Sequence, residues 1–242
     1  MGMRPLRNIA LVLLAFLLGP SVASASIYSI SSGTTNQVVS PIVSSPYPYG
    51  QSAAEFYNYN YPNTYSGDPA FGTRSDAAYF WLYADEQNSL SLGMIFDTPQ
   101  DATGGTMQLS ISGLPSNAYW VVRDDPGEWS YTISSEGETN PMWQWSACCT
   151  DGGVIAGLGN TVNPLEWDIV IDLVASQSIS NWFFLSGPDR NNPTLTEIDL
   201  SRDGSLIISS SVSVVPLPPS AILFGTALLG LAGLRRKKRK AA

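Results

Sequence analysis

Histidine is absent from this chain of 242 residues. Its absence excludes Ser-His-Asp and Cys-His catalysis, histidine-ligated zinc sites and the HExxH motif of metalloproteases. Cysteine is nearly absent, since the only two, Cys148 and Cys149, are adjacent. Redox enzymes usually space these residues as Cys-x-x-Cys near a βαβ unit, and neither feature is present. The missing residue types therefore argue against most enzyme classes.

Positive charge is scarce between the two ends of the chain. Of the twelve Lys and Arg residues, two lie near the N-terminus and six lie at positions 235–240. Residues 26–215 contain no lysine and four arginines, against all twenty acidic residues, which is a formal charge of −16. Such a surface repels nucleic acid and anionic membranes, so we expect no nucleic-acid partner. The negative charge is consistent with a surface that keeps the domain soluble or with one that binds divalent cations.

Residues 1–25 have the three parts of a secretory signal peptide. Arg4 and Arg7 form a positive start, residues 9–18 are apolar, and Ala23 and Ala25 supply the small residues that signal peptidase requires. This apolar run is too short to cross a bilayer core of about 30 Å, so a retained membrane helix is the weaker interpretation. We expect export through the Sec translocon and cleavage after Ala25.

Residues 215–242 have the composition of a membrane anchor. Residues 216–234 measure about 28 Å as a helix, which is enough to cross a bilayer. Six cations follow, and the positive-inside rule keeps them cytoplasmic: Arg235, Arg236, Lys237, Lys238, Arg239 and Lys240. These cations argue against a buried core helix. We therefore expect a transmembrane helix with everything between the two ends of the chain outside the cytoplasm.

The tail resembles the sorting signal of PEP-CTERM proteins, which joins a short proline motif, a hydrophobic helix and an Arg-rich terminus. The motif here is Val215, Pro216, Leu217, Pro218 and Pro219, with leucine where the family has glutamate. The resemblance implies a Gram-negative bacterium, processing by an exosortase-like enzyme, and association with exopolysaccharide or biofilm. It is limited to the tail and implies nothing about the rest of the chain.

Residues 26–215 have a length that suits one domain. The part 26–75 is rich in Ser, Pro, Tyr and Asn and shows no long hydrophobic period, so we expect an extended arm with one or two short strands. Its tyrosines form either a loop across the domain or a patch that stacks on sugars: Tyr47, Tyr49, Tyr57, Tyr59, Tyr61 and Tyr65.

Residues 76–214 show short segments of β character separated by Gly, Pro, Asn and Asp. The expected strands are 79–83, 89–96, 106–114, 118–122, 129–133, 165–174, 182–185, 194–200 and 205–214. In the segment 165–174, Leu165, Trp167 and Ile169 share one face. The last two strands flank Arg202-Asp203-Gly204, a hairpin signal. We predict a mostly β domain without helices, a β-sandwich or jelly roll, with a barrel as the alternative.

The stretch around the two cysteines is unusual. In an oxidising compartment Cys148 and Cys149 should not stay reduced, and a vicinal disulfide is favoured over intermolecular bridges and free thiols. A ring closed between adjacent residues is strained, because their Cα atoms are closer than in most disulfides. Trp143 and Trp145 share one face of an extended segment, where they either enter the core or stack on sugar rings.

Acidic loops are candidates for calcium, which takes six to eight oxygen ligands. Asp124, Asp125 and Glu128 lie in one turn, and Asp151 precedes two glycines. EF-hand spacing is absent, and Asp-Pro-Gly and Asp-Gly are ordinary turn formers, so simple turns are the alternative.

Three functions remain for the exported domain. The first is a structural or adhesive protein of the cell surface or extracellular matrix, and the second is a carbohydrate-binding module for exopolysaccharide. The third is a glycoside hydrolase, which needs two carboxylates across a cleft. We rank them in this order and expect no enzyme, because no residue pattern selects a carboxylate pair.

Overall fold

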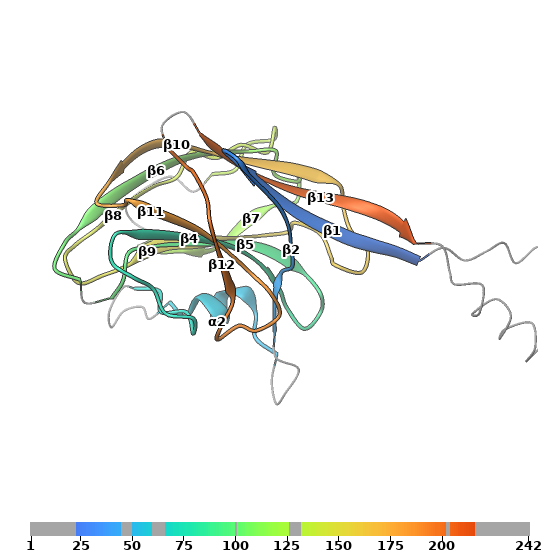
Figure 1. Ribbon diagram of the computed structural model, residues 1–242, viewed down its shortest axis with the longest axis horizontal. Helices are drawn as coiled ribbons and strands as arrows, with labels where there is room; N and C mark the ends of the chain where they lie inside the picture. The colour runs from blue at the N-terminus through green and yellow to red at the C-terminus, as the bar shows by residue number, and fades with distance from the viewer. Residues whose placement is uncertain are drawn as a thin grey trace, which may run out of the picture. The chain divides into compact units, whose positions relative to one another are not determined.

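The computed structural model describes residues 23–44, 50–59, 66–99, 101–125, 132–201 and 204–215. The chain divides into two units, of which Ser26–Val212 is one and Met1–Ala25 with Ser213–Ala242 is the other. The first unit is mostly β, as predicted, with two sheets and a short helix among its described residues (Figure 1).

The first sheet has six strands in the order β2-β1-β13-β10-β6-β8. Their bounds are β1 Ala23–Ser32, β2 Thr35–Val39, β6 Gly105–Ser112, β8 Met142–Trp145, β10 Trp167–Gln177 and β13 Ser205–Val215. In β6 the predicted alternation is confirmed, because Met107, Leu109 and Ile111 are all buried while their neighbours are partly exposed. Alternate residues of a strand point to opposite faces, so this sheet has one apolar face.

The second sheet has seven strands, and six of them follow the order β12-β11-β4-β5-β9-β7. Their bounds are β4 Ala77–Ala84, β5 Leu90–Phe96, β7 Tyr119–Arg123, β9 Asp151–Ala156, β11 Asn181–Ser186 and β12 Thr194–Glu197. The seventh strand, β3 (Ile42–Val43), pairs with β4. Both β3 and β11 run parallel to β4, whereas β5 runs antiparallel to it.

Strand β4 is buried on both faces, which explains its uninterrupted apolar sequence. Ala78, Phe80 and Leu82 belong to the larger core cluster, which includes side chains of both sheets. Tyr79 and Trp81 point to the opposite face, into a second core cluster that includes Phe56 and Tyr57 from α2 (Ala53–Tyr57). Figure 1 shows α2 on the outer side of the seven-stranded sheet.

The helix α2 corrects the prediction for residues 26–75, which were expected to form an extended arm with one or two short strands. Ser52 and Glu55 form a capping box, in which Glu55 N donates to Ser52 Oγ at 3.2 Å and Ser52 N donates to Glu55 Oε2 at 2.7 Å. Asn58 closes the other end in the left-handed conformation. Five residues are too few to show a helical period, so caps and tertiary packing stabilise this helix.

The segment 26–75 also differs from the predicted extended arm. It contributes β1, β2, β3 and α2, and its strands pair within both sheets. The reason is that β1 and β2 form a hairpin at Gly33 and β1 then pairs with the distant strand β13, which local sequence patterns do not reveal.

Two strand predictions near the end of the unit are wrong in detail. Leu165 precedes β10 and is exposed, although Trp167 and Ile169 are buried as predicted. The segments 194–197 and 205–215 do not form a hairpin, because β12 lies at the edge of one sheet and β13 lies inside the other. The connection between them instead crosses from sheet to sheet.

Residues 129–131 of the strand expected at 129–133 lie outside the described residues.

Several predictions concern residues that the structure does not describe. The signal peptide before residue 23, the motif from Pro216 onward, the helix expected at 216–234 and the basic residues 235–240 are among them. Within the described residues, no helix has the length and apolar character needed to cross a membrane.

Candidate ligand groove beside helix α2

The two tryptophans proposed to stack on sugars lie in the core. Trp143 is 0% exposed and Trp145 is 4% exposed. Trp143 Nε1 donates to Gly152 O at 2.7 Å, and Trp145 Nε1 donates to Asp97 Oδ2 at 2.8 Å. Both rings pack against Phe96. The hypothesis that they form a sugar platform is therefore wrong, and their alternation in β8 serves the core.

Cys148 and Cys149 form a vicinal disulfide with their Cα atoms 3.7 Å apart. The turn that carries it follows β8, and Cys149 N donates to Ser146 O at 3.2 Å. Cys148 is exposed, whereas Thr150 is buried and donates through Oγ1 to Gly67 O at 2.9 Å. The disulfide thus lies at the surface on a turn whose far end is held by the core.

The carboxylates proposed as calcium ligands are engaged in hydrogen bonds. Asp151 is buried and accepts from Gln144 N at 3.0 Å and from Gly152 N at 2.7 Å. Asp124 is also buried, and Asp125 accepts a hydrogen bond from Tyr59. Glu128 lies outside the described residues. Across the described ranges, no three Asp, Glu or Cys side chains come together as a metal site requires. Asp124, Asp125 and Asp151 therefore have structural roles among the described residues, and the calcium site stays a prediction.

Two of these carboxylates join the end of β7 to the last residue of α2 and to the segment that follows it. Asp124 Oδ2 accepts from the Tyr57 hydroxyl at 2.6 Å, and Asp125 Oδ1 accepts from the Tyr59 hydroxyl at 3.0 Å. Asp125 N donates back to the Tyr59 oxygen at 3.1 Å. These bonds connect residues 66 or 67 positions apart in the sequence. They fix the position of α2 relative to β7.

Burial raises the pKa of Asp124 to about 8. The hydrogen bond from Tyr57 opposes this rise in pKa, and the negative charge of Asp125 adds to it. Burial also raises the pKa of Asp125. Desolvation disfavours the charged form of a carboxyl group, so Asp124 retains its proton near neutral pH.

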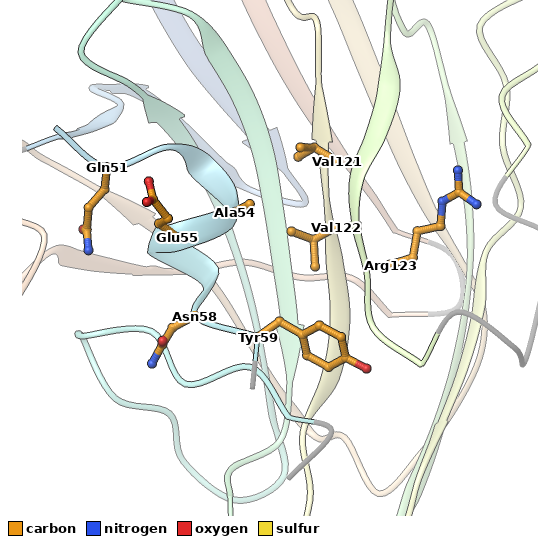
Figure 2. Close-up of a pocket in the computed structure, with 8 residues that line it drawn as sticks. All are labelled: Gln51, Ala54, Glu55, Asn58, Tyr59, Val121, Val122 and Arg123. Atoms are coloured by element: carbon orange, nitrogen blue, oxygen red, sulfur yellow. The ribbon is translucent and has the colours of Figure 1, made fainter. Parts of the chain in front are cut away.

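A hollow of about 640 Å³ lies between α2 and β7, next to this pair of bonds. Figure 2 shows Gln51, Glu55, Asn58 and Tyr59 on the helix side, with Val121 and Val122 opposite them on β7. The Arg123 side chain points away from the helix in this view. The hollow therefore has one polar wall from α2 and its flanks, and a wall from β7 in which Val121 and Val122 are apolar and Arg123 is charged.

The polar wall is held by local bonds. Asn58 Nδ2 donates to Asp68 O at 2.9 Å, and Ser52 Oγ donates to Glu55 Oε2 at 2.8 Å. Gln51 Oε1 accepts from Arg190, and Gln51 N donates to Ser44 Oγ at 2.7 Å. Such bonds fix side-chain rotamers before any ligand arrives, which lowers the entropic cost of binding.

A second hollow of about 430 Å³ continues along the other end of α2. Ser52, Ala53, Asn117, Tyr119 and Val121 are among its lining residues. Val121 lines both hollows, so they meet at this residue. We call the two together the α2 groove.

The backbone of β7 determines which side chains reach the α2 groove. The pairing of β7 with β9 contains a register shift between Trp120 and Val122. Without a bulge these two residues would share a face, but Trp120 belongs to the core between the sheets and Val122 to the cluster under α2. Tyr119 and Val121 remain 57% and 40% exposed.

Sequence reasoning missed the α2 groove, because its two walls come from segments more than 50 residues apart. A sequence signal existed for α2 alone, since Ser52-Ala53-Ala54-Glu55 is a capping-box pattern. Of the tyrosines proposed as a sugar-stacking patch, Tyr57 is buried in the core and Tyr59 lines the groove. Tyr47, Tyr49, Tyr61 and Tyr65 lie outside the described residues.

Comparison with known proteins identifies no relative: no protein-family profile, no curated protein and no solved structure matches this chain.

Proposed function

We propose that this chain is an exported, membrane-anchored protein of the bacterial surface or extracellular matrix with a structural or adhesive role. Its domain would be a β-sandwich, because the larger core cluster joins the apolar faces of two sheets. Export by the Sec translocon, cleavage after Ala25 and sorting of the PEP-CTERM-like tail by an exosortase-like enzyme are parts of this proposal.

The observation that carries the proposal is that the two ends of the compact unit lie side by side. Strands β1 and β13 are neighbours in the six-stranded sheet, and Ser211 Oγ donates to Ile27 O at 3.5 Å. Figure 1 shows the start of β1 and the end of β13 at the same end of the sheet. The unit begins at Ser26, the residue after the expected cleavage site. A domain whose N- and C-terminal strands lie together at one end can be held at that end. It would then present its opposite end to its surroundings.

The vicinal disulfide lies at that opposite end of the domain. Trp145, where β8 ends, pairs with Gly105 at the start of β6, and Thr106 pairs with Gln177 at the end of β10. The start of β10, Trp167, pairs with Ser210 near the end of the unit. The eleven residues of β10 span about 36 Å at about 3.3 Å per residue. The disulfide turn is thus separated from the end proposed for attachment by the length of the strand β10.

A hydrolase is not proposed. Glycoside hydrolysis needs two carboxylates that face a substrate across a cleft. Asp124, whose pKa burial raises to about 8, is 0% exposed and accepts a hydrogen bond from Tyr57. It therefore has no access to a substrate in this structure.

Surface display can be tested in a Gram-negative bacterium that contains an exosortase. Protease added to intact cells should degrade the domain, as detected with an antibody to it. A variant without residues 1–25 should be protected inside the cell, and a variant with Arg235 to Lys240 replaced by serine should escape into the medium. Protection of the unaltered chain from protease in intact cells would refute the proposal.

A further inference from the structure

The α2 groove is a feature of the domain that the proposed function leaves unexplained. Its hollows of about 640 and about 430 Å³ together exceed the volume of a typical small-molecule pocket. They lie one after the other along α2 and meet at Val121. This shape suits an extended chain of several linked units better than a single compact ligand.

The lining of the groove indicates the chemistry of that chain. Tyr119 offers an exposed aromatic ring on β7, and Val121 continues the apolar strip. Asn117, just before β7, lines the same hollow as Tyr119, and Asn58 and Glu55 line the other hollow from the α2 side. A flat ring beside hydrogen-bonding amides complements a sugar, which has an apolar face and a rim of hydroxyl groups.

Charge and polarity argue against other partners. The formal charge of −16 between residues 26 and 215 repels polyanions, including acidic polysaccharides and nucleic acid. The apolar strip of two exposed side chains is too small for a hydrophobic peptide or a lipid chain. An uncharged glycan remains, and a cationic peptide is the rival that an experiment must separate from it.

We propose that the α2 groove binds a linear, uncharged oligosaccharide. Tyr119 stacks on one sugar ring, while Asn58, Asn117 and Glu55 bond hydroxyl groups along the chain. The inference rests on the proposed function for its biological setting, since only an exported domain meets extracellular polysaccharide. Binding itself is a property of the purified chain.

The test is isothermal titration of the full chain in a detergent without a sugar headgroup. The probes are linear hexasaccharides of glucose, mannose and N-acetylglucosamine, with hexagalacturonate as the anionic probe and hexalysine as the cationic probe. We expect at least one neutral hexasaccharide to bind with a Kd of about 1 mM or tighter. Raising the salt concentration should leave this Kd unchanged, because the ligand carries no charge.

Variants locate the binding. Tyr119→Ala should weaken binding about tenfold, whereas Tyr119→Phe should retain it, because stacking requires the ring and not the hydroxyl. Val121→Arg, at the point that both hollows share, should abolish binding. Val38→Ala is the matched control, since Val38 is an exposed apolar residue on β2 of the other sheet. Circular dichroism of each variant confirms that the fold is retained.

The proposal is overturned if no neutral hexasaccharide binds, if hexalysine alone binds, or if Tyr119→Ala binds as tightly as the unaltered chain. Its failure is distinguishable from failure of the proposed function. A chain that binds the glycan but resists protease in intact cells would refute surface display and leave the groove assignment intact. A displayed chain that binds no neutral glycan would do the reverse.

Discussion

Replacing Asp124 by asparagine should remove a pH dependence of stability that the buried carboxyl group creates. Burial raises the pKa of Asp124 in the folded chain to about 8, against an ordinary value of 3.8. The unfolded chain therefore releases this proton at lower pH than the folded chain does. The stabilisation is complete below pH 3.8 and is lost as the pH rises through about 8.

The size of the effect follows from the two pKa values. Between them the free energy of unfolding falls by about 1.4 kcal/mol for each pH unit. From pH 5 to pH 8 this amounts to about 4 kcal/mol, which is a large part of the stability of a typical domain. An asparagine side chain cannot ionise, and its carbonyl can still accept the bond from Tyr57. The Asp124→Asn variant should therefore gain about 4 kcal/mol relative to the unaltered chain over this range.

Urea unfolding of both chains, followed by tryptophan fluorescence from pH 5 to pH 8, measures this difference. Glu136→Gln is the control, because hydrogen bonds from Ser135 and Ser134 lower the pKa of this exposed carboxyl group. Glu136 is ionised in both the folded and unfolded chain above pH 5, so its variant should run parallel to the unaltered chain. Parallel curves for Asp124→Asn, or a difference of the opposite sign, would refute the reasoning.

Three further predictions concern stability and use the same unfolding measurement. Trp143→Ala should cost about 4 kcal/mol, because it leaves a cavity where a fully buried ring was; a cost below about 1 kcal/mol would show that the ring is not in the core. The double change of Cys148 and Cys149 to serine should cost only about 1 kcal/mol, because a disulfide between adjacent residues closes a very short loop; a loss above about 3 kcal/mol would contradict this. Ser52→Ala should cost about 1 kcal/mol through the lost cap of α2, whereas Ser52→Asp should restore most of it.

The strands were largely predictable because their patterns are local. The alternation of Met107, Leu109 and Ile111 predicts one buried face wherever the strand lies in the fold, and all three are buried. The uninterrupted run from Tyr79 to Tyr83 predicts burial on both sides, and two separate core clusters meet at β4. A period of two requires no knowledge of the neighbouring strand.

Pairing between distant strands was not predictable in this way. Arg202-Asp203-Gly204 has the composition of a hairpin turn, but β12 and β13 lie in different sheets. Turn composition predicts where the chain changes direction, not which strand it meets next. The helix α2 was missed for a related reason, since Phe56 and Tyr57 pack on β4 and β5 residues far away in the sequence.

The amino-acid sequence by itself determined the β character of the domain, the positions of most strands and the exclusion of histidine-dependent chemistry. It also carries the predicted export signal and anchor, which remain predictions. The tertiary structure decided which aromatic residues are exposed, which carboxyl groups are buried and where a groove forms. The bond from Tyr57 to Asp124 spans 67 positions. A site of this kind exists only after long-range pairing has brought its parts together, so no local pattern could indicate it.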